Sequence, residues 1–117
     1  RLGYFEAPLL VIATVFNLLA SSGKTLSSLL APFQTTAATG EINFEVEDKA
    51  GMMEKIESTY HDAKTISHLD GITIEYDDWW CNVRPSNTEP LLRLNLEART
   101  AEIRDAKLTE LTSILKT

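Results

Sequence analysis

The sequence predicts an α+β fold, in which a four-stranded antiparallel sheet carries two helices on one face and follows a separate N-terminal helix. Three observations lead to this prediction. Apolar and polar residues alternate in several short segments after residue 40, as in strands with one solvated face. Two segments with helical spacing each follow a residue that can cap a helix. Residues 7–20 form a nearly continuous apolar run.

This apolar run predicts a helix that begins at Pro8 and ends before Ser21, Ser22 and Gly23. Its apolar residues cover most of the helix circumference, so it requires enclosure on several sides, which the rest of the chain does not supply. The run is too short to span a bilayer, and no basic N-terminal region or signal-peptidase site accompanies it. We therefore predict a remnant helix of a preceding domain.

A linker is predicted after this helix. Residues 24–30 suit a short second helix, and residues 31–40 contain Pro32 and three threonines, a composition typical of linkers. We predict a boundary here, with residues 1–38 forming the remnant helix and linker and residues 39–117 forming a C-terminal domain.

The predicted domain begins with a strand over residues 41–47, followed by a helix over residues 49–61 that Asp48 caps. An Asp70-Gly71 turn leads into a second strand over residues 72–76. A turn at Asp77 and Asp78 precedes a third strand over residues 79–83, and a fourth strand covers residues 91–98. Thr100 caps a final helix. This order predicts a TBP-like antiparallel sheet with both helices on one face and the other face open.

The overall charge limits the classes of ligand. The formal net charge of -6 argues against nucleic acid and anionic membranes as partners, because proteins that bind them present a basic face. An anionic ligand therefore needs a local basic site. Four of the five arginines lie in one stretch that can supply it, namely Arg84, Arg93, Arg99 and Arg104.

A single cysteine, Cys81, excludes an intramolecular disulfide and suits a reducing, cytoplasmic setting. Trp79 and Val83 lie at alternate positions around it, which predicts a core residue rather than a nucleophile. By the same alternation, Trp79 and Trp80 point to opposite faces of their strand.

The candidate site is the segment that joins the third and fourth strands, Arg84-Pro85-Ser86-Asn87-Thr88-Glu89-Pro90. Two prolines bracket short polar side chains, so the loop is stiff and rich in donors that suit phosphate oxygens. The arginine guanidinium can pair with two phosphate oxygens at once. A plain hairpin connection explains the composition alone equally well.

The whole string, however, resembles the phosphate loop of the phosphohexomutases of the phosphomannomutase/phosphoglucomutase family. The similarity extends to four flanking segments, which are Gly71-Ile72-Thr73-Ile74, Leu91-Leu92-Arg93-Leu94-Asn95-Leu96-Glu97-Ala98-Arg99, Ser22-Gly23-Lys24-Thr25-Leu26 and Gly40-Glu41-Ile42-Asn43. It therefore covers most of the chain.

The resemblance implies a four-domain cytoplasmic enzyme that moves a phosphoryl group between the 1- and 6-positions of a hexose phosphate through a bisphosphorylated intermediate. The phosphoserine, the magnesium loop and the sugar-recognition loop of that family belong to the other three domains. The resemblance thus implies that this fragment has no cofactor of its own and is inactive alone. The full enzyme would use Mg²⁺ and a hexose 1,6-bisphosphate activator. The partners implied are the hexose phosphate and the preceding domains.

By the same resemblance, the ligands of the phosphate that is not transferred are Arg84, Ser86, Asn87 and Thr88, with no catalytic residue and no metal ligand in the fragment. Arg93 either reaches the phosphate or pairs with Glu75 or Glu97. Glu89 either holds Arg84 or a backbone donor in place or is plain surface. Asn87, where related loops have glycine, resembles the phosphomannomutase and phosphoglucomutase branch more than the phosphoglucosamine mutase branch.

Other motifs do not support a site. Gly23-Lys24-Thr25 lacks the earlier glycine and the strand of a P-loop, and the two histidines, His61 and His68, lack zinc-site spacing. The competing functions are a stand-alone phospholigand-binding module and a structural interaction domain.

Overall fold

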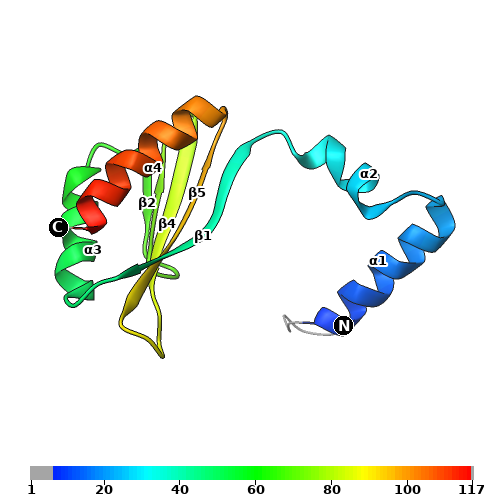
Figure 1. Ribbon diagram of the computed structural model, residues 1–117, viewed down its shortest axis with the longest axis horizontal. Helices are drawn as coiled ribbons and strands as arrows, with labels where there is room; N and C mark the ends of the chain where they lie inside the picture. The colour runs from blue at the N-terminus through cyan, green and yellow to red at the C-terminus, as the bar shows by residue number, and fades with distance from the viewer. Residues whose placement is uncertain (1–6, 117) are drawn as a thin grey trace. The chain divides into compact units, whose positions relative to one another are not determined.

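The computed structural model describes residues 7–116, and the chain divides into two compact units, Arg1–Thr35 and Thr36–Thr117. The first unit contains the helices α1 (Pro8–Ser22) and α2 (Leu26–Leu30) and the 3-10 helix η1 (Ala31–Phe33). The second contains all the strands and two further helices (Figure 1). Its elements are β1 (Ala37–Glu45), α3 (Lys49–Thr59), β2 (Thr65–Ser67), β3 (Ile72–Glu75), β4 (Trp79–Pro85), β5 (Leu91–Ala98) and α4 (Ala101–Leu115).

The first unit matches the predicted helices. Pro8 occupies the first turn of α1, and Gly23 ends the helix with a φ of 63°. The structure buries no residue of α1, and Leu9 and Phe16 are 80% and 67% exposed. Such an apolar surface requires cover. The assignment of residues 1–38 to a preceding domain stays a prediction.

Among residues 7–116, no single helix is long and apolar enough to cross a membrane. Only α1 and the segment Leu26–Phe33 taken together, with a 98° bend between them, reach the required length and composition.

The second unit is an α+β domain with α3 and α4 on one face of an antiparallel sheet, as predicted (Figure 1). The predicted number of four strands is wrong, because the sheet has five strands in the order β1-β5-β4-β3-β2. The missed strand is β2, in which Thr65, Ile66 and Ser67 pair with β3. Three residues with one apolar side chain are too few to show an alternating pattern.

β1 begins at Ala37, so residues 37–40, which were predicted to be linker, belong to the sheet. Its pairing with β5 shifts register between Ala38 and Glu41. Gly40 has a φ of 70°, and the Thr39 hydroxyl accepts a hydrogen bond from the Leu96 amide at 3.1 Å. This is a β-bulge, which breaks the alternation and explains why the start of the strand was missed.

The core lies between the sheet and the two helices. Its largest fully buried side chains come from α3, α4 and the three central strands, and are Ile56, Ile74, Cys81, Val83, Leu92, Leu94, Leu96 and Leu111. The predicted caps are confirmed, because the side chains of Asp48 and Thr100 accept hydrogen bonds from the amides of Gly51 and Ile103. Cys81 is fully buried, which confirms the predicted core position, and this burial raises the pKa of its thiol to about 12.

The turn before β3 touches the start of the candidate loop. Gly71 has a φ of 69°, and a Cβ atom there would lie 2.3 Å from the Val83 carbonyl oxygen and 2.7 Å from the Arg84 Cα. Glycine is therefore needed twice, for its left-handed backbone and for its lack of a side chain. The close approach fixes Asp70 beside Arg84.

We expect Gly71→Ala to destabilise the domain by about 3 kcal/mol, since backbone strain adds to a clash with a central strand. Gly40→Ala is the matched control, because Gly40 has nearly the same φ of 70° but no atom within 4 Å of its Cβ position. This control should cost only about 1 kcal/mol. Urea unfolding followed by tryptophan fluorescence measures both, and equal losses would contradict the proposed clash.

Candidate functional site

The loop between β4 and β5 is a tight turn in which two hydroxyl groups lie close together. The Ser86 amide donates to the Leu91 carbonyl at 2.9 Å. The Ser86 hydroxyl accepts a hydrogen bond from the Thr88 amide at 3.4 Å and lies 3.5 Å from the Thr88 hydroxyl. Ser86 is 5% exposed, and it is the one buried polar residue in the described part of the chain. The loop therefore has a defined shape that presents several donors on one turn.

Lys49, the first residue of α3, holds this loop in place. Its Nζ atom donates to the Ser86 carbonyl at 3.0 Å and to the Glu89 carbonyl at 3.2 Å. Sequence reasoning missed this residue, and no local signal marks it. Only the pairing of β1 with β5 brings the start of α3 beside the loop, where the Val46 amide also donates to the Pro90 carbonyl at 3.2 Å.

Arg84 and Arg93 lie directly opposite each other on β4 and β5. Their strand neighbours Val83, Leu92 and Leu94 are buried against the helices, so both arginines project from the open face. The predicted basic site thus has two guanidinium groups side by side at the base of the loop.

Carboxylates from three segments surround these guanidinium groups. Glu41 contacts both, at 3.0 Å from Arg84 Nη2 and 3.5 Å from Arg93 Nη1. Asp70 lies 3.4 Å from Arg84 Nη1, and Glu89 lies 3.9 Å from Arg93 Nη2. The hydrogen bond that Arg84 donates to Glu41 is the main cause that raises the pKa of Arg84 above its ordinary value.

Arg93 and Glu89 form contacts that the sequence did not predict. Arg93 pairs with Glu41 and Glu89 rather than with Glu75 or Glu97, because the bulge in β1 places Glu41 beside it. Of the alternatives for Glu89, the structure shows no contact with Arg84: its side chain is exposed and lies near Arg93, at a distance where an exposed ion pair contributes little. The Nε atom of Arg93 is buried and has no hydrogen-bond partner among residues 7–116.

The open face is hollowed beside Arg84. This hollow of about 380 Å³ extends from Arg84 to Trp80, which is 38% exposed while Trp79 is buried, as predicted. It is lined by Ala38, Gly40, Asp70, Thr73, Trp80, Asn82, Arg84, Asn95, Leu96 and Glu97.

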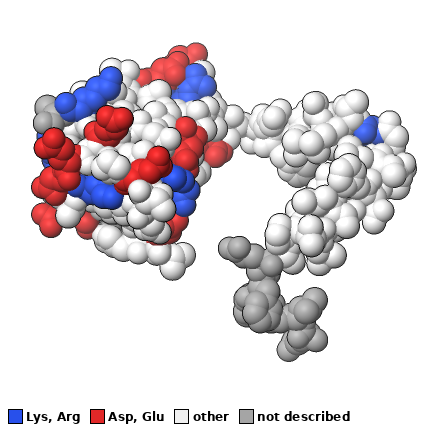
Figure 2. Space-filling view, turned by 60° about the horizontal axis from the view of Figure 1, so that its bottom comes forward, with Lys and Arg blue, Asp and Glu red and all other residues white. Residues whose placement is uncertain are grey.

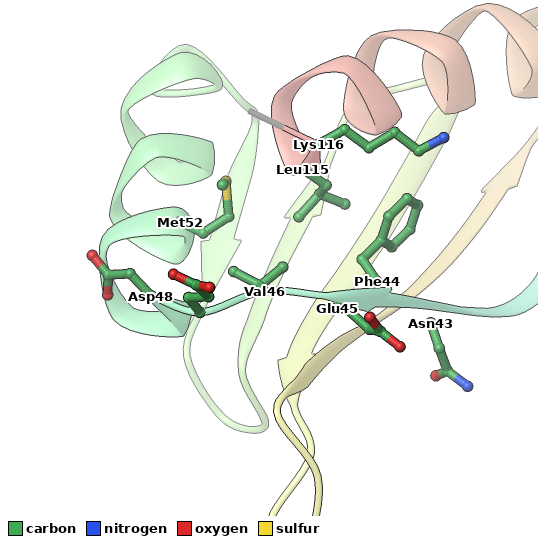
Figure 3. Close-up of a pocket in the computed structure, with 9 residues that line it drawn as sticks. Asn43, Phe44, Glu45, Val46, Asp48, Met52, Leu115 and Lys116 are labelled. Carbon is green, nitrogen blue, oxygen red and sulfur yellow. The ribbon is translucent and has the colours of Figure 1, made fainter.

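A larger groove of about 840 Å³ lies elsewhere, between β1, the start of α3 and the end of α4 (Figure 3). Phe44, Val46, Met52 and Leu115 form its apolar surface, with three carboxylates and Lys116 at its rim. Apolar walls beside carboxylates are unsuited to a phosphate, and no residue of the loop lines this groove. The size of a hollow therefore does not identify the site.

On the face that Figure 2 shows, the charged side chains do not gather into a separate basic patch. Acidic and basic side chains are interspersed over the visible face of the second unit (Figure 2). Among the described residues, no group of three or more His, Cys, Asp or Glu side chains could hold a metal ion. Asp77 and Asp78 lie in the turn before β4, as predicted, and His68 pairs with Glu57 at 3.2 Å.

The sequence of this domain matches that of a known protein family. Residues 41–110 match the C-terminal domain of phosphoglucomutase/phosphomannomutase. The chain belongs to the phosphoglucomutase/phosphomannomutase family. The matched region runs from β1 into α4 and contains the whole candidate loop. The resemblance seen in the loop and its flanks is thereby confirmed at the level of the family.

Relatives in this family align along nearly the whole chain. A phosphomannomutase of Methanocaldococcus jannaschii is 43% identical over 98% of the chain, which covers 25% of that protein. A protein named as phosphohexose mutases from Xanthomonas campestris pv. campestris is 37% identical over 97% of the chain and 26% of its own length. The chain thus spans about a quarter of these relatives.

A solved structure supports the fold. The crystal structure of a phosphoglucomutase/phosphomannomutase family protein from Burkholderia thailandensis matches with a TM-score of 0.59 and 25% identity. The match covers 77% of this chain and 19% of that one.

We expect Lys49→Met to loosen the loop without unfolding the domain, because it removes two charge-assisted hydrogen bonds to the loop carbonyls and keeps the aliphatic stem. Hydrogen exchange at the Ser86 and Thr88 amides should accelerate at least about tenfold, which corresponds to about 1.4 kcal/mol of local opening. Lys64→Met is the control, since the contacts of Lys64 are with Asp77, away from the loop. Unchanged exchange in Lys49→Met would show that Lys49 does not restrain the loop.

Proposed function

We propose that this chain is the phosphate-gripping part of a phosphohexomutase and that its loop binds the phosphate of a hexose phosphate that is not being transferred. The observation that carries the proposal is the loop of the family domain, where the hydroxyls of Ser86 and Thr88 lie 3.5 Å apart and Arg84 stands at the base. Asn87, exposed between the two hydroxyl-bearing residues, adds an amide donor.

The physical basis of the grip is a set of donors that is held before the ligand arrives. A phosphate accepts several hydrogen bonds, and a guanidinium can supply two of them together. The loop is fixed at one end by the Ser86–Leu91 hydrogen bond and along its length by Lys49. Little conformational entropy is then lost on binding, so more of the interaction energy remains as affinity.

In this proposal the reacting groups lie in other parts of a longer cytoplasmic enzyme, whose partners include the hexose phosphate and the preceding domains but no nucleic acid or membrane. A phosphoserine, Mg²⁺ and a hexose 1,6-bisphosphate activator would supply the transfer between the 1- and 6-positions. In this proposal the Mg²⁺ would be held in another part of the longer enzyme, since residues 7–116 contain no group of three or more His, Cys, Asp or Glu side chains that could hold it. This chain alone would bind and orient without turnover.

Titration of this chain with glucose 1-phosphate should shift the NMR signals of the Ser86, Asn87 and Thr88 amides, with a dissociation constant on the order of 1 mM, since one grip lacks the contacts of a complete cleft. Arg84→Ala should weaken binding at least about tenfold, because it removes a charge-assisted fork. Arg104→Ala, which removes an arginine paired with Asp105 on α4, should leave it unchanged. Shifts confined to another surface would overturn the assignment.

In the full-length enzyme, Arg84→Ala should remove about 2 to 4 kcal/mol of transition-state stabilisation. The value of kcat/KM for a hexose phosphate should fall accordingly. Binding energy from the non-reacting phosphate orients the reacting part of the substrate, so its loss slows turnover. Phosphorylation of the enzyme by a small phosphoryl donor that does not reach this loop should persist. A change in kcat/KM below about twofold would exclude the phosphate grip.

A further inference from the structure

The bulge in β1 determines which way Glu41 points. Ala38 is opposite Glu97 and Glu41 is opposite Asn95, so two residues of β1 face the single residue Leu96 on β5. Without the extra residue, Glu41 would stand opposite Leu94, whose side chain lies in the core. The bulge therefore transfers Glu41 from the helix-covered face to the open face, where Arg84 and Arg93 project.

Two features make this bulge well defined. Gly40 adopts the left-handed conformation with a φ of 70°, which L side chains rarely adopt. The Thr39 hydroxyl accepts a hydrogen bond from the Leu96 amide at 3.1 Å and lies 3.2 Å from the Leu96 carbonyl oxygen. It thus takes the place of the backbone hydrogen bonds between β1 and β5 that the bulge interrupts at Leu96. Glu41 is thus mounted on a restrained strand rather than on a mobile loop.

Glu41 also solves an electrostatic problem at the loop. Like charges directly opposite on neighbouring strands repel, and Arg84 and Arg93 form such a pair. One oxygen of Glu41 contacts Arg84 at 3.0 Å and the other contacts Arg93 at 3.5 Å. Asp70 contacts the other terminal nitrogen of Arg84, and Glu89 lies near the other terminal nitrogen of Arg93. A guanidinium group has five N–H donors, so each arginine still has donors for an anion.

We propose that Glu41 is a positioning residue that bridges Arg84 and Arg93 and holds both guanidinium groups at the base of the loop for one phosphate. This inference rests on the proposed phosphate-binding function and adds Arg93 to the groups that meet the phosphate. The buried Nε donor of Arg93, which has no partner among residues 7–116, supports a further acceptor at this site. A carboxylate cannot itself donate to the phosphate, so Glu41 acts through the arginines.

The sign of the effect of Glu41→Gln distinguishes this role from simple repulsion. Removing a negative charge near the site would by itself tighten the binding of an anion. If Glu41 positions the arginines, its loss should instead weaken binding. We expect Glu41→Gln to raise the dissociation constant for inorganic phosphate three- to tenfold, measured on this chain from the Ser86, Asn87 and Thr88 amide shifts. Glu41→Asp, which keeps the charge but shortens the side chain, should not restore binding.

Glu45→Gln is the matched control. Glu45 is exposed on the same strand, and this substitution removes the same charge. It should leave the dissociation constant unchanged or lower it slightly. The Nε–H signals of Arg84 and Arg93 should move in Glu41→Gln and stay in place in Glu45→Gln. A merely structural role would change unfolding by urea without changing these signals.

A double-mutant cycle separates the two proposals. Glu41→Gln should cost less in the Arg84→Ala background than in the unchanged chain, because its contact with Arg84 is already lost and only its contact with Arg93 remains. If Arg84→Ala weakens phosphate binding while Glu41→Gln leaves it unchanged or tightens it, the positioning role is wrong and the phosphate site stands. If phosphate shifts none of the loop amides and Arg84→Ala has no effect, the phosphate site itself is wrong.

Discussion

Two positive charges that face each other across β4 and β5 set the constraint on which this site depends. Arg84 and Arg93 repel at this spacing unless anions lie between or beside them. Glu41 on β1 and Asp70 in the turn before β3 supply most of that compensation, and Glu89 in the loop adds a longer contact. Each anion depends on a separate structural device, including the bulge at Gly40 and the close turn at Gly71. The site is therefore a product of several distant segments.

The core keeps the two arginines on the open face. Every second residue of β5 is buried, and burying a leucine side chain contributes about 1.5 to 3 kcal/mol. A slip of one residue in register would expose Leu92, Leu94 and Leu96 and would turn Arg93 into the core. Burying the unpaired charge of Arg93 would cost several kcal/mol of folding free energy, so the slipped register is strongly disfavoured. Hydrophobic packing on one face thus fixes the position of cations on the other.

What the sequence could predict was local. The caps at Asp48 and Thr100, the loop and the alternation of β5 involve residues close together in the chain, and the structure confirms these elements. Strand β2 was too short to show a period, and the bulge reversed the alternation at the start of β1. The contacts of Lys49 and Glu41 span 37 and 43 residues, so their detection needed the sheet pairing. The phosphate ligands remain predictions from the family resemblance.

On the proposed phosphate-binding function, net charge explains why the loop must be held firmly. The chain carries a formal charge of -6, so its long-range field opposes the approach of a phosphate. Around the loop, the charges of Arg84, Arg93 and Lys49 are offset by those of Glu41, Asp70 and Glu89. Attraction must then come from directed, short-range hydrogen bonds, whose strength depends on geometry. Lys49 restrains the loop, Gly71 places Asp70 beside Arg84, and Glu41 contacts both arginines. The site would therefore bind an anion through fixed hydrogen-bond donors rather than through a net positive charge.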